Sequence, residues 1–423
     1  MNFNSLIFRS GEPIIRSTLD MDFYKFTMGR VIWEKYPGVH TVFQMMNRTK
    51  SVRLVEHIDK GELSEQLEHC RILKPTISEM HYLRGTNEYS ERMFPEGYLS
   101  YYKDRTLSLP SIDIKDGQYD VRTTDGLWLK DSEWETKVLA ITNELYSRSL
   151  LKGYSRFQLE AMQARGQVRL DADIRLLRKH PGLTLSDFGS RRRFSALWQE
   201  YVVQVMAAEL PGQFLGTSNT YLAMKYGLMP IGTSAHEMYM VLAGMMNESD
   251  DSIRASHRRM LTDWYDVYGP GLSIALTDTF GTEFFFNDFI EEMAHKWKGF
   301  RHDSGDPIKF GERVLRFYRE LGIDAREKMI VFSDGLDAQT MVKLYLHFEG
   351  RIRVTFGWGT NLTNNFGLLT LSLVMKAILA NGVPLVKLSD NPAKATGLPE
   401  QIKRIMAVFG YHPELYSYVP CIR

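Results

Sequence analysis

Cysteine is nearly absent from this chain of 423 residues: Cys70 and Cys421 are its only two, and they lie far apart in the sequence. Two such cysteines build neither a disulfide framework nor a cysteine-based zinc site, and their scarcity is typical of proteins that fold in a reducing cytosol. We therefore expect Cys70 to be a small residue of the core and the protein to be cytoplasmic.

Net charge and long apolar runs are also missing. Lys and Arg number 52 against 51 Asp and Glu, which gives a formal charge of +1. No global field would recruit nucleic acid or an anionic membrane, so any anion site must be local. No stretch reaches the roughly 18 apolar residues of a membrane span, and the N-terminal sequence lacks the pattern of a secretory signal. We expect a soluble protein that binds neither nucleic acid nor membrane.

Several catalytic motifs do not occur. The sequence has no GxSxG elbow, no GxxxxGK[ST] loop, no GxGxxG after the first strand, and no HxH or HExxH. These absences argue against a serine hydrolase, a P-loop NTPase, a Rossmann dehydrogenase and a resident zinc site. The candidate chemistry must therefore come from residues that are distant in sequence.

The length of the chain predicts two domains. Residues 1–135 combine a strand, a polar-faced helix and a small antiparallel sheet, at 39–48, 52–73 and 112–129. The sheet is expected from alternating apolar residues around the hairpin dipeptides Asp116–Gly117 and Asp125–Gly126. We assign 1–135 to an N-terminal α+β sandwich domain that is completed by part of 385–423.

After helical patterns at 133–150 and 155–165, short apolar runs alternate with helical segments, and each run ends in Gly, Asp, Ser or Thr. The runs lie at 183–193, 212–220, 229–237, 272–282, 299–307, 329–337 and 352–361, with an eighth if 383–392 is counted. This number of βα units favours a closed or nearly closed barrel. We predict an irregular, TIM-like α/β barrel over 136–384, with the polar ends of all its strands meeting on one face.

The stretch GFRHDSGDP, at 299–307, carries the densest chemistry. Pro307 can open a helix, so the polar groups before it lie on a strand-to-helix turn. Arg301 offers a planar fork of donors to an anion, Ser304 adds a hydroxyl, and Asp303 accepts from sugar hydroxyls. A helix cap would explain Asp or Ser, but not Arg, His and Gly-rich turns at the same end of one barrel.

Other strand ends add matching groups. FGWGTN contains Gly357, Gly359 and Thr360, which suit a phosphate cradle of backbone N–H groups and a hydroxyl. The run 191–193 is the densest positive spot of the chain. Asp278 and Asp334 are further acceptors for ribose hydroxyls or for a metal-bound diphosphate.

Two single residues stand out. His236 lies beside Glu237, and a carboxylate that orients an imidazole makes it a better nucleophile toward phosphorus. Tyr24 lies near the expected start of a helix capped by Asp20 or Asp22, where an exposed aromatic ring can cover a flat heterocycle.

Nine motifs occur in order from about Asp20 to Gly397: LDMDFYKFTM, DFGSRRR, GTSNTYLA, GTSAHE, LTDTFGT, FRHDSGDP, FSDGLD, FGWGTNLTNN and KLSDNPAKATG. Together they resemble the nicotinate phosphoribosyltransferase family of type II phosphoribosyltransferases. The resemblance implies formation of nicotinate mononucleotide and diphosphate from nicotinate and 5-phosphoribosyl-1-diphosphate, with coupled ATP hydrolysis and Mg²⁺ bound through the diphosphate or ATP. It also implies a barrel with a sandwich domain and a homodimer with sites near the interface.

The resemblance assigns roles to individual residues. His236, Arg301 and Asp303 would be catalytic, with His236 phosphorylated by ATP. The remaining residues would bind substrate: Tyr24 of the neighbouring subunit and Phe188 against the pyridine, Arg191 at the diphosphate, Asp334 at the ribose, Gly357, Gly359 and Thr360 at the 5-phosphate, and Ser218, Asp278 and Ser304 nearby. The RRR run leaves open which of Arg191, Arg192 and Arg193 contacts phosphate.

Ser218 bears on the choice between acid and amide. The related nicotinamide enzyme carries Asp in this GT-x turn, which would repel the carboxylate of nicotinate, whereas a hydroxyl can donate to it. Nicotinamide phosphoribosyltransferase, quinolinate phosphoribosyltransferase and a non-catalytic nucleotide-sensing barrel remain the alternatives. An aldolase-like barrel would need a lysine at a strand end, and none stands in the seven motifs.

Overall fold

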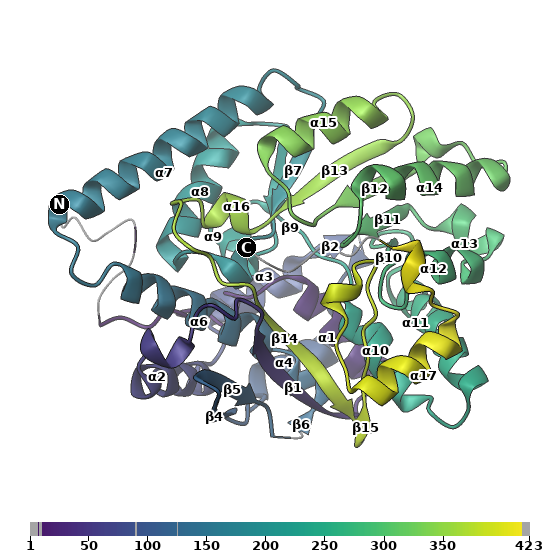
Figure 1. Cartoon of the computed structure of the whole chain (residues 1–423), viewed down its shortest axis with the longest axis horizontal. Helices are drawn as coiled ribbons and strands as arrows, with labels where there is room; N and C mark the ends of the chain where they lie inside the picture. Colours follow the sequence, from purple (N-terminus) through teal and green to yellow (C-terminus); the bar gives the residue numbers. More distant parts are fainter. Residues whose placement is uncertain (1–6, 8–10, 89–90, 125, 417–423) are drawn as a thin grey trace.

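The computed structural model describes residues 7, 11–88, 91–124 and 126–416, which form two large β-sheets surrounded by helices (Figure 1). A third, two-stranded antiparallel sheet pairs β2 (Asn87–Glu88) with β3 (Glu91–Arg92). Seven strands make a parallel sheet in the order β10-β11-β12-β13-β7-β8-β9. Their bounds are Thr184–Asp187 for β7, Phe214–Thr217 for β8, Met229–Pro230 for β9, Ile274–Leu276 for β10, Gly299–His302 for β11, Met329–Phe332 for β12 and Arg353–Trp358 for β13. The predicted α/β barrel is confirmed.

The barrel is irregular because one seam does not close. Among the described residues, β9 pairs with β8 and β10 pairs with β11, but β9 and β10 are not paired with each other. β9 has two residues and ends at Pro230, which has no backbone N–H to donate to a further ladder. After this strand the chain runs into α10 (His236–Met245) and α11 (Asp250–Tyr268) before it returns as β10.

One helix of the barrel, α7, precedes its first strand, and the others follow strands. The helices are α7 (Arg156–Leu177), α8 (Ala196–Glu209), α9 (Thr220–Tyr226), α12 (Thr282–Asp288), α13 (Glu291–Lys296), α14 (Pro307–Glu320), α15 (Ala338–Phe348) and α16 (Thr360–Thr363). α14 begins as its sequence predicts: Asp306 accepts from the backbone N–H groups of Ile308 and Lys309 at 2.9 and 3.0 Å, and Pro307 is the first helical residue. The turn that carries Arg301 and Asp303 is thus fixed against the start of a helix.

The second sheet is antiparallel, with the order β15-β14-β1-β5-β4 and β6 beside β1. Its strands are β1 (His40–Asn47), β4 (Ser111–Lys115), β5 (Gln118–Arg122), β6 (Gly126–Leu127), β14 (Leu373–Ala380) and β15 (Val383–Pro384). The predicted hairpin at Asp116–Gly117 is present, and both residues have positive φ angles of 52° and 74°. Asp125 lies outside the described residues, and Gly126 starts a strand that pairs with β1.

The segment 383–392 is not an eighth βα unit. β15 pairs antiparallel with β14, and β14 lies along β1 from Thr41↔Ala380 to Asn47↔Leu373. The division into domains 1–135, 136–384 and 385–423 stays a prediction. However, β14 and β15 belong to the antiparallel sheet, and their residues lie within the range 136–384 that was assigned to the barrel. The long return of the chain brings the loop after β15 against the barrel (Figure 1).

Among the described residues, six α-helices accompany the N-terminal part, and α17 follows the second sheet: α1 (Tyr24–Lys35), α2 (Lys60–Ile72), α3 (Ile77–Gly85), α4 (Glu96–Asp104), α5 (Trp128–Asp131), α6 (Trp134–Leu150) and α17 (Pro399–Phe409). Neither Asp20 nor Asp22 caps α1, contrary to the prediction. Phe23 is the N-cap residue and makes no side-chain cap, because both carboxylates are bound elsewhere.

One contiguous hydrophobic core underlies both sheets. Cys70 belongs to it, as expected, and burial raises the pKa of its thiol to about 12. Cys421 lies outside the described residues. In the part of the chain that the structure describes, no helix combines the length and the apolar character that crossing a membrane requires.

Candidate active site

The carboxyl ends of the parallel strands and the loop after β15 enclose a cavity of ≈ 410 Å³, which we call the polar cavity. Its walls contain eight of the predicted site residues: Phe188, Arg191, His236, Arg301, Asp303, Asp334, Gly359 and Thr360. These residues lie at or just after the ends of five strands of the barrel, β7, β9, β11, β12 and β13, so the predicted meeting of strand ends on one face is found. Their chemical roles are taken up below as proposals.

A second cavity of ≈ 750 Å³ lies inside the barrel, and we call it the barrel cavity. It shares Phe188, Arg191 and Arg301 with the polar cavity, and Tyr24 and Ser218 line it as well. The shared residues mark the junction between a largely apolar space and a charged one. Such a junction suits a flat ring that carries one polar substituent.

Tyr24 is only 7% exposed, so the predicted exposed position is wrong. Its hydroxyl donates to Glu135 at 3.0 Å, and the Arg191 guanidinium lies 5.5 Å from the ring centre. The resemblance placed the tyrosine of a neighbouring subunit against the pyridine. In the structure, the chain's own Tyr24 lines the same cavity as its own Phe188.

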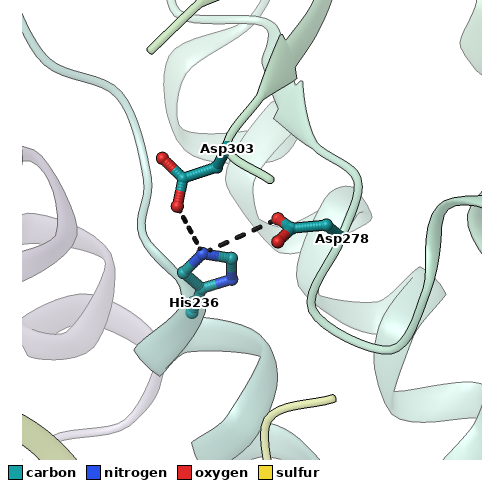
Figure 2. Close-up of side chains that lie close together, drawn as sticks. All are labelled: His236, Asp278 and Asp303. Atoms are coloured by element: carbon teal, nitrogen blue, oxygen red, sulfur yellow. Dashed lines mark hydrogen bonds and ion pairs between the residues drawn. The ribbon is translucent and has the colours of Figure 1, made fainter. Parts of the chain in front are cut away.

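His236 is the first residue of α10 and is held at both ring nitrogens. Nε2 lies 2.9 Å from Asp303 and 3.7 Å from Asp278 (Figure 2). Nδ1 lies 2.9 Å from the hydroxyl of Thr279. An ionised carboxylate only accepts, so Nε2 carries the proton and Nδ1 accepts from the Thr279 hydroxyl. Burial, together with the nearby Lys387 ammonium, lowers the pKa of His236 to about 4, which leaves the imidazole neutral at pH 7.

The carboxylate that orients His236 is therefore not that of Glu237, contrary to the prediction. Glu237 accepts from Lys25 at 2.5 Å, from Ser132 at 2.5 Å and from the Trp128 indole at 3.1 Å. Successive residues of a helix point about 100° apart, so a neighbour in sequence rarely faces the same partner. Asp303, 67 positions further along the chain, takes the role instead.

Asp278 and Ser304 lie behind the histidine and do not face the polar cavity. They are 1% and 2% exposed, and the Ser304 hydroxyl donates to Asp278 Oδ2 at 2.5 Å. Lys387 donates to the same oxygen at 3.1 Å. Asp278 lies beside His236 and Ser304 holds Asp278, and the substrate-binding role predicted for the two residues stays a prediction.

His236, Asp278 and Asp303 bring their ligand atoms within 4.8 Å of one another, a spacing that a metal ion could bridge. The imidazole already donates to Asp303, and the Lys387 ammonium already neutralises Asp278. Burial raises the pKa of Asp278, but Lys387 and His236 outweigh burial and leave it below its usual value. The arrangement serves as a holder for the imidazole.

Arg301 is fixed between the two cavities. Its guanidinium donates to Asp303 at 3.0 Å, to the hydroxyl of Ser333 at 3.1 Å and to the backbone carbonyl of Ser234 at 3.3 Å. Three partners in different directions hold the planar fork in one orientation. The same Asp303 therefore positions both His236 and Arg301.

The three arginines of the RRR run differ in where they point. Arg193 is buried and forms a bidentate pair with Asp20 at 2.6 and 2.8 Å. Arg191 and Arg192 line the polar cavity, and Arg191 also pairs with Asp22 and Glu135 at 3.2 Å each. Arg191 and Arg192 are thus the candidates for phosphate contact.

The glycine loop is built around Phe188. A Cβ on Gly357 would lie 2.3 Å from the Phe188 ring, so this glycine makes room for the aromatic ring. Gly359 and Thr360 line the polar cavity, whereas Gly357 does not. Gly357 therefore makes room for Phe188, and its predicted phosphate role stays a prediction.

Ser218 has a partner that the sequence did not suggest. Its hydroxyl donates to Asp22 at 2.7 Å. Burial raises the pKa of Asp22, which opposes the lowering effect of Arg191. A carboxyl group thus does lie beside Ser218, and the predicted donation from a free Ser218 hydroxyl to nicotinate is revised.

Four cations of the polar cavity were missed by the sequence reasoning: Arg48, Lys376, Lys387 and Lys394. They come from the antiparallel sheet and the loops beside it, outside the barrel pattern that guided the search. Lys394 donates to Asp334 at 2.7 Å, and burial lowers the pKa of Lys376 to about 8. The motif KLSDNPAKATG contains Lys387 and Lys394 and was the available signal.

Two family models match the chain. The nicotinate phosphoribosyltransferase (NAPRTase) N-terminal domain matches residues 19–143, and the NAPRTase family matches residues 183–412. Together they include both sheets and all the residues of the site described above.

Solved structures agree. The chain is 31% identical to a nicotinate phosphoribosyltransferase from Porphyromonas gingivalis, with 94% of this chain and 100% of that chain covered and a TM-score of 0.83. For the enzyme from Vibrio cholerae the identity is 29%, the coverage 97% and 96%, and the TM-score 0.85. For a putative one from Saccharomyces cerevisiae these values are 26%, 96% and 100%, and 0.81. The chain belongs to the nicotinate phosphoribosyltransferase family.

Proposed function

We propose that the chain makes nicotinate mononucleotide and diphosphate from nicotinate and 5-phosphoribosyl-1-diphosphate, and that ATP hydrolysis drives this step through phosphorylation of His236. The reaction would salvage nicotinate for NAD synthesis in the cytoplasm. The observation that carries the proposal is the neutral imidazole of His236, held by Asp303, in one cavity with Arg301 and the cations described above.

The pyridine ring would bind at the junction of the two cavities. The Phe188 ring packs against Gly357, and Tyr24 lines the same cavity. Arg301 can donate to the carboxylate of nicotinate or stack on its ring. Ser218 and Asp22 would lie near the polar substituent as a hydrogen-bonded pair. A half-buried guanidinium favours an anionic substituent, which supports nicotinate over its amide.

The sugar phosphate would extend from this junction into the polar cavity. Asp334 and Asp303 are acceptors for ribose hydroxyls, and the backbone at Gly359 and the Thr360 hydroxyl can cradle the 5-phosphate. The leaving diphosphate carries several negative charges. The positive charges that would bind it come from Arg191, Arg192, Lys376, Lys387 and Lys394, which all line the polar cavity.

Cleavage of the bond between ribose C1 and the diphosphate oxygen leaves an oxocarbenium-like ribose, which the lone pair of pyridine N1 captures. No base is required, because this nitrogen carries no proton at neutral pH. The protein contributes by holding N1 close to C1 and by stabilising the charge of the leaving group.

Mg²⁺ would arrive with the diphosphate or with ATP. Asp303 and Asp334 present carboxylates to the polar cavity, and such oxygen ligands are those that Mg²⁺ prefers. When bound, the ion would add positive charge beside the departing diphosphate.

ATP would act through the imidazole. The unprotonated ring nitrogen of His236 attacks the γ-phosphorus, a nitrogen–phosphorus bond forms, and the bond to ADP breaks. Water later cleaves the phosphohistidine to release phosphate. In between, the added charge at the start of α10 would favour a closed state that binds the substrates more tightly. We further propose a homodimer with its sites near the subunit interface.

The test is a product assay on the purified chain with phosphoribosyl diphosphate and Mg²⁺, with nicotinate or nicotinamide, and with or without ATP. The proposal expects nicotinate mononucleotide and an equal amount of diphosphate, with a rate that ATP increases. Preferential use of nicotinamide would identify the related amide enzyme. Ligand binding without release of diphosphate would indicate a nucleotide sensor.

A further inference from the structure

Lys25 lies outside both cavities and yet adjoins the residues that line them. It is the second residue of α1, next to Tyr24, and its side chain is fully buried. Its ammonium lies 5.2 Å from the ring centre of Tyr24 and 5.6 Å from that of Phe43. A buried charge is costly unless it is paired, so its partners indicate what it does.

Two carboxylates share this single ammonium. Nζ of Lys25 lies 2.7 Å from Glu135 and 2.5 Å from Glu237, and it also donates to the Ser132 hydroxyl at 3.1 Å. Burial lowers the pKa of Lys25, but the two carboxylates outweigh burial and raise it above its usual value. The charged ammonium therefore joins the first turns of three helices, α1, α6 and α10.

The Glu237 side of the link leads to His236. Glu237 is the next residue of α10, and its other oxygen accepts from Trp128 and Ser132. These contacts anchor the first turn of the helix that begins with the histidine. A displacement of the His236 backbone would therefore displace Glu237 against Lys25.

The Glu135 side leads to the ring-binding residues. The oxygen that meets Lys25 also accepts from the Tyr24 hydroxyl at 3.0 Å, and the second oxygen lies 3.2 Å from Arg191. Tyr24 and Arg191 both line the barrel cavity. Glu135 thus sets the position of Tyr24, which would lie near the pyridine, and of Arg191, which lines the same cavity and would reach the diphosphate.

We propose that Lys25 is a positioning residue that couples the phosphorylation state of His236 to the affinity for nicotinate. The link runs from His236 through Glu237, Lys25 and Glu135 to Tyr24 and Arg191, and each step is a direct contact. The inference rests on the proposed use of ATP at His236. A phosphoryl group brings about −1.5 to −2 charges to the start of α10, which changes the balance at the shared ammonium.

The test compares Lys25→Met with Lys137→Met. Lys137 is a matched control, because it is also buried, lies on α6 and pairs with Glu133 at 2.7 Å, a carboxylate that Arg105 also binds. The measured quantity is the ratio of the KM for nicotinate without ATP to that with ATP. Phosphohistidine from labelled ATP, the ATP-free kcat and the melting temperature are recorded for each variant.

In Lys25→Met the KM ratio should fall toward one. We expect a decrease of at least about fivefold, because about fivefold is the lower end of usual coupling strengths between two sites. Labelling of His236 and the ATP-free kcat should stay within about threefold of the values for Lys137→Met, since Lys25 touches no substrate. If Lys25 had only a structural role, the KM ratio would fall equally in Lys25→Met and Lys137→Met. That result overturns the inference. An unchanged KM ratio in Lys25→Met overturns it as well.

Glu237→Gln cuts the same link from the other side and carries the test if Lys25→Met does not fold. In Glu237→Gln the KM ratio should fall toward one, while His236 is still labelled by ATP. A KM ratio equal to that of the wild type contradicts the inference. A wild-type chain that shows no effect of ATP on KM removes both this inference and the proposed ATP coupling. If ATP lowers the KM for nicotinate equally in the wild type, Lys25→Met and Glu237→Gln, the inference is wrong, but the proposed ATP coupling stands.

Discussion

Asp303 holds Nε2 of His236 at 2.9 Å with one oxygen and the guanidinium of Arg301 at 3.0 Å with the other. One carboxylate at the end of β11 therefore positions the group proposed to take phosphate from ATP and a group proposed to bind the pyridine. This shared contact explains why the two functions occupy a single cavity.

Replacing His236 by Asn should separate the two functions. Without the imidazole the chain cannot take a phosphoryl group, but the groups that hold the pyridine and the ribose remain. A slow ATP-independent synthesis of nicotinate mononucleotide should persist, and the ratio of rates with and without ATP should fall to about one. Initial rates with and without ATP measure this ratio, and a ratio equal to that of the wild type would remove His236 from the coupling.

The imidazole of His236 should titrate far below the usual range. Burial and Lys387 lower its pKa to about 4, so it should stay neutral at pH 5.5, where an exposed histidine is mostly protonated. The unfolded chain binds this proton near pH 6.5, so the residue costs folding stability as the pH falls from about 6.5 to 4. NMR titration, with His236→Asn for assignment, gives the pKa, and a value near 6.5 would contradict the burial of the ring.

Arg301→Met should lower kcat/KM for nicotinate by about 10² to 10³, the usual effect of removing one donor to a transition-state charge. Arg326→Met is the control, because Arg326 is exposed and pairs only locally with Asp324. Steady-state kinetics measure the loss, and unfolding curves check that the fold survives. Equal activity in the two variants would place the reacting groups elsewhere.

Gly357→Ala should weaken the binding of nicotinate more than the binding of phosphoribosyl diphosphate. The new Cβ would lie 2.3 Å from the Phe188 ring, so the ring must move. We expect the KM for nicotinate to rise at least about fivefold, since overpacking costs about 1–3 kcal/mol. Gly38→Ala, where a Cβ meets nothing within 4 Å, is the control. A larger rise of KM for phosphoribosyl diphosphate than for nicotinate would support the phosphate role predicted for Gly357.

The sequence allowed the barrel and its polar face to be predicted because both depend on local patterns. Short apolar runs that end in Gly, Asp, Ser or Thr mark the carboxyl ends of strands, and parallel strands bring those ends to one face. The segment 383–392 has the same local pattern, but β15 joins the other sheet. Only the pairing with β14 distinguishes it, and pairing is a long-range property.

The side-chain partners could not be predicted for the same reason. Ser218 meets Asp22, which is 196 positions away, and Asp278 meets Lys387, which is 109 positions away. No spacing rule relates residues of separate segments, so the buried roles of Asp278 and Ser304 and the packing role of Gly357 became visible only in the fold. The family resemblance placed Phe188 and Arg301 near the pyridine, and both residues line the two cavities, although their role at the ring stays a prediction.

The most direct test of the account is a crystal structure of the chain with nicotinate mononucleotide, diphosphate and Mg²⁺. The account predicts the pyridine ring against Phe188 and Arg301, the 5-phosphate at Gly359 and Thr360, and the diphosphate against Arg191 and Lys387. A pyridine ring bound away from Phe188, with the diphosphate outside the polar cavity, would contradict it.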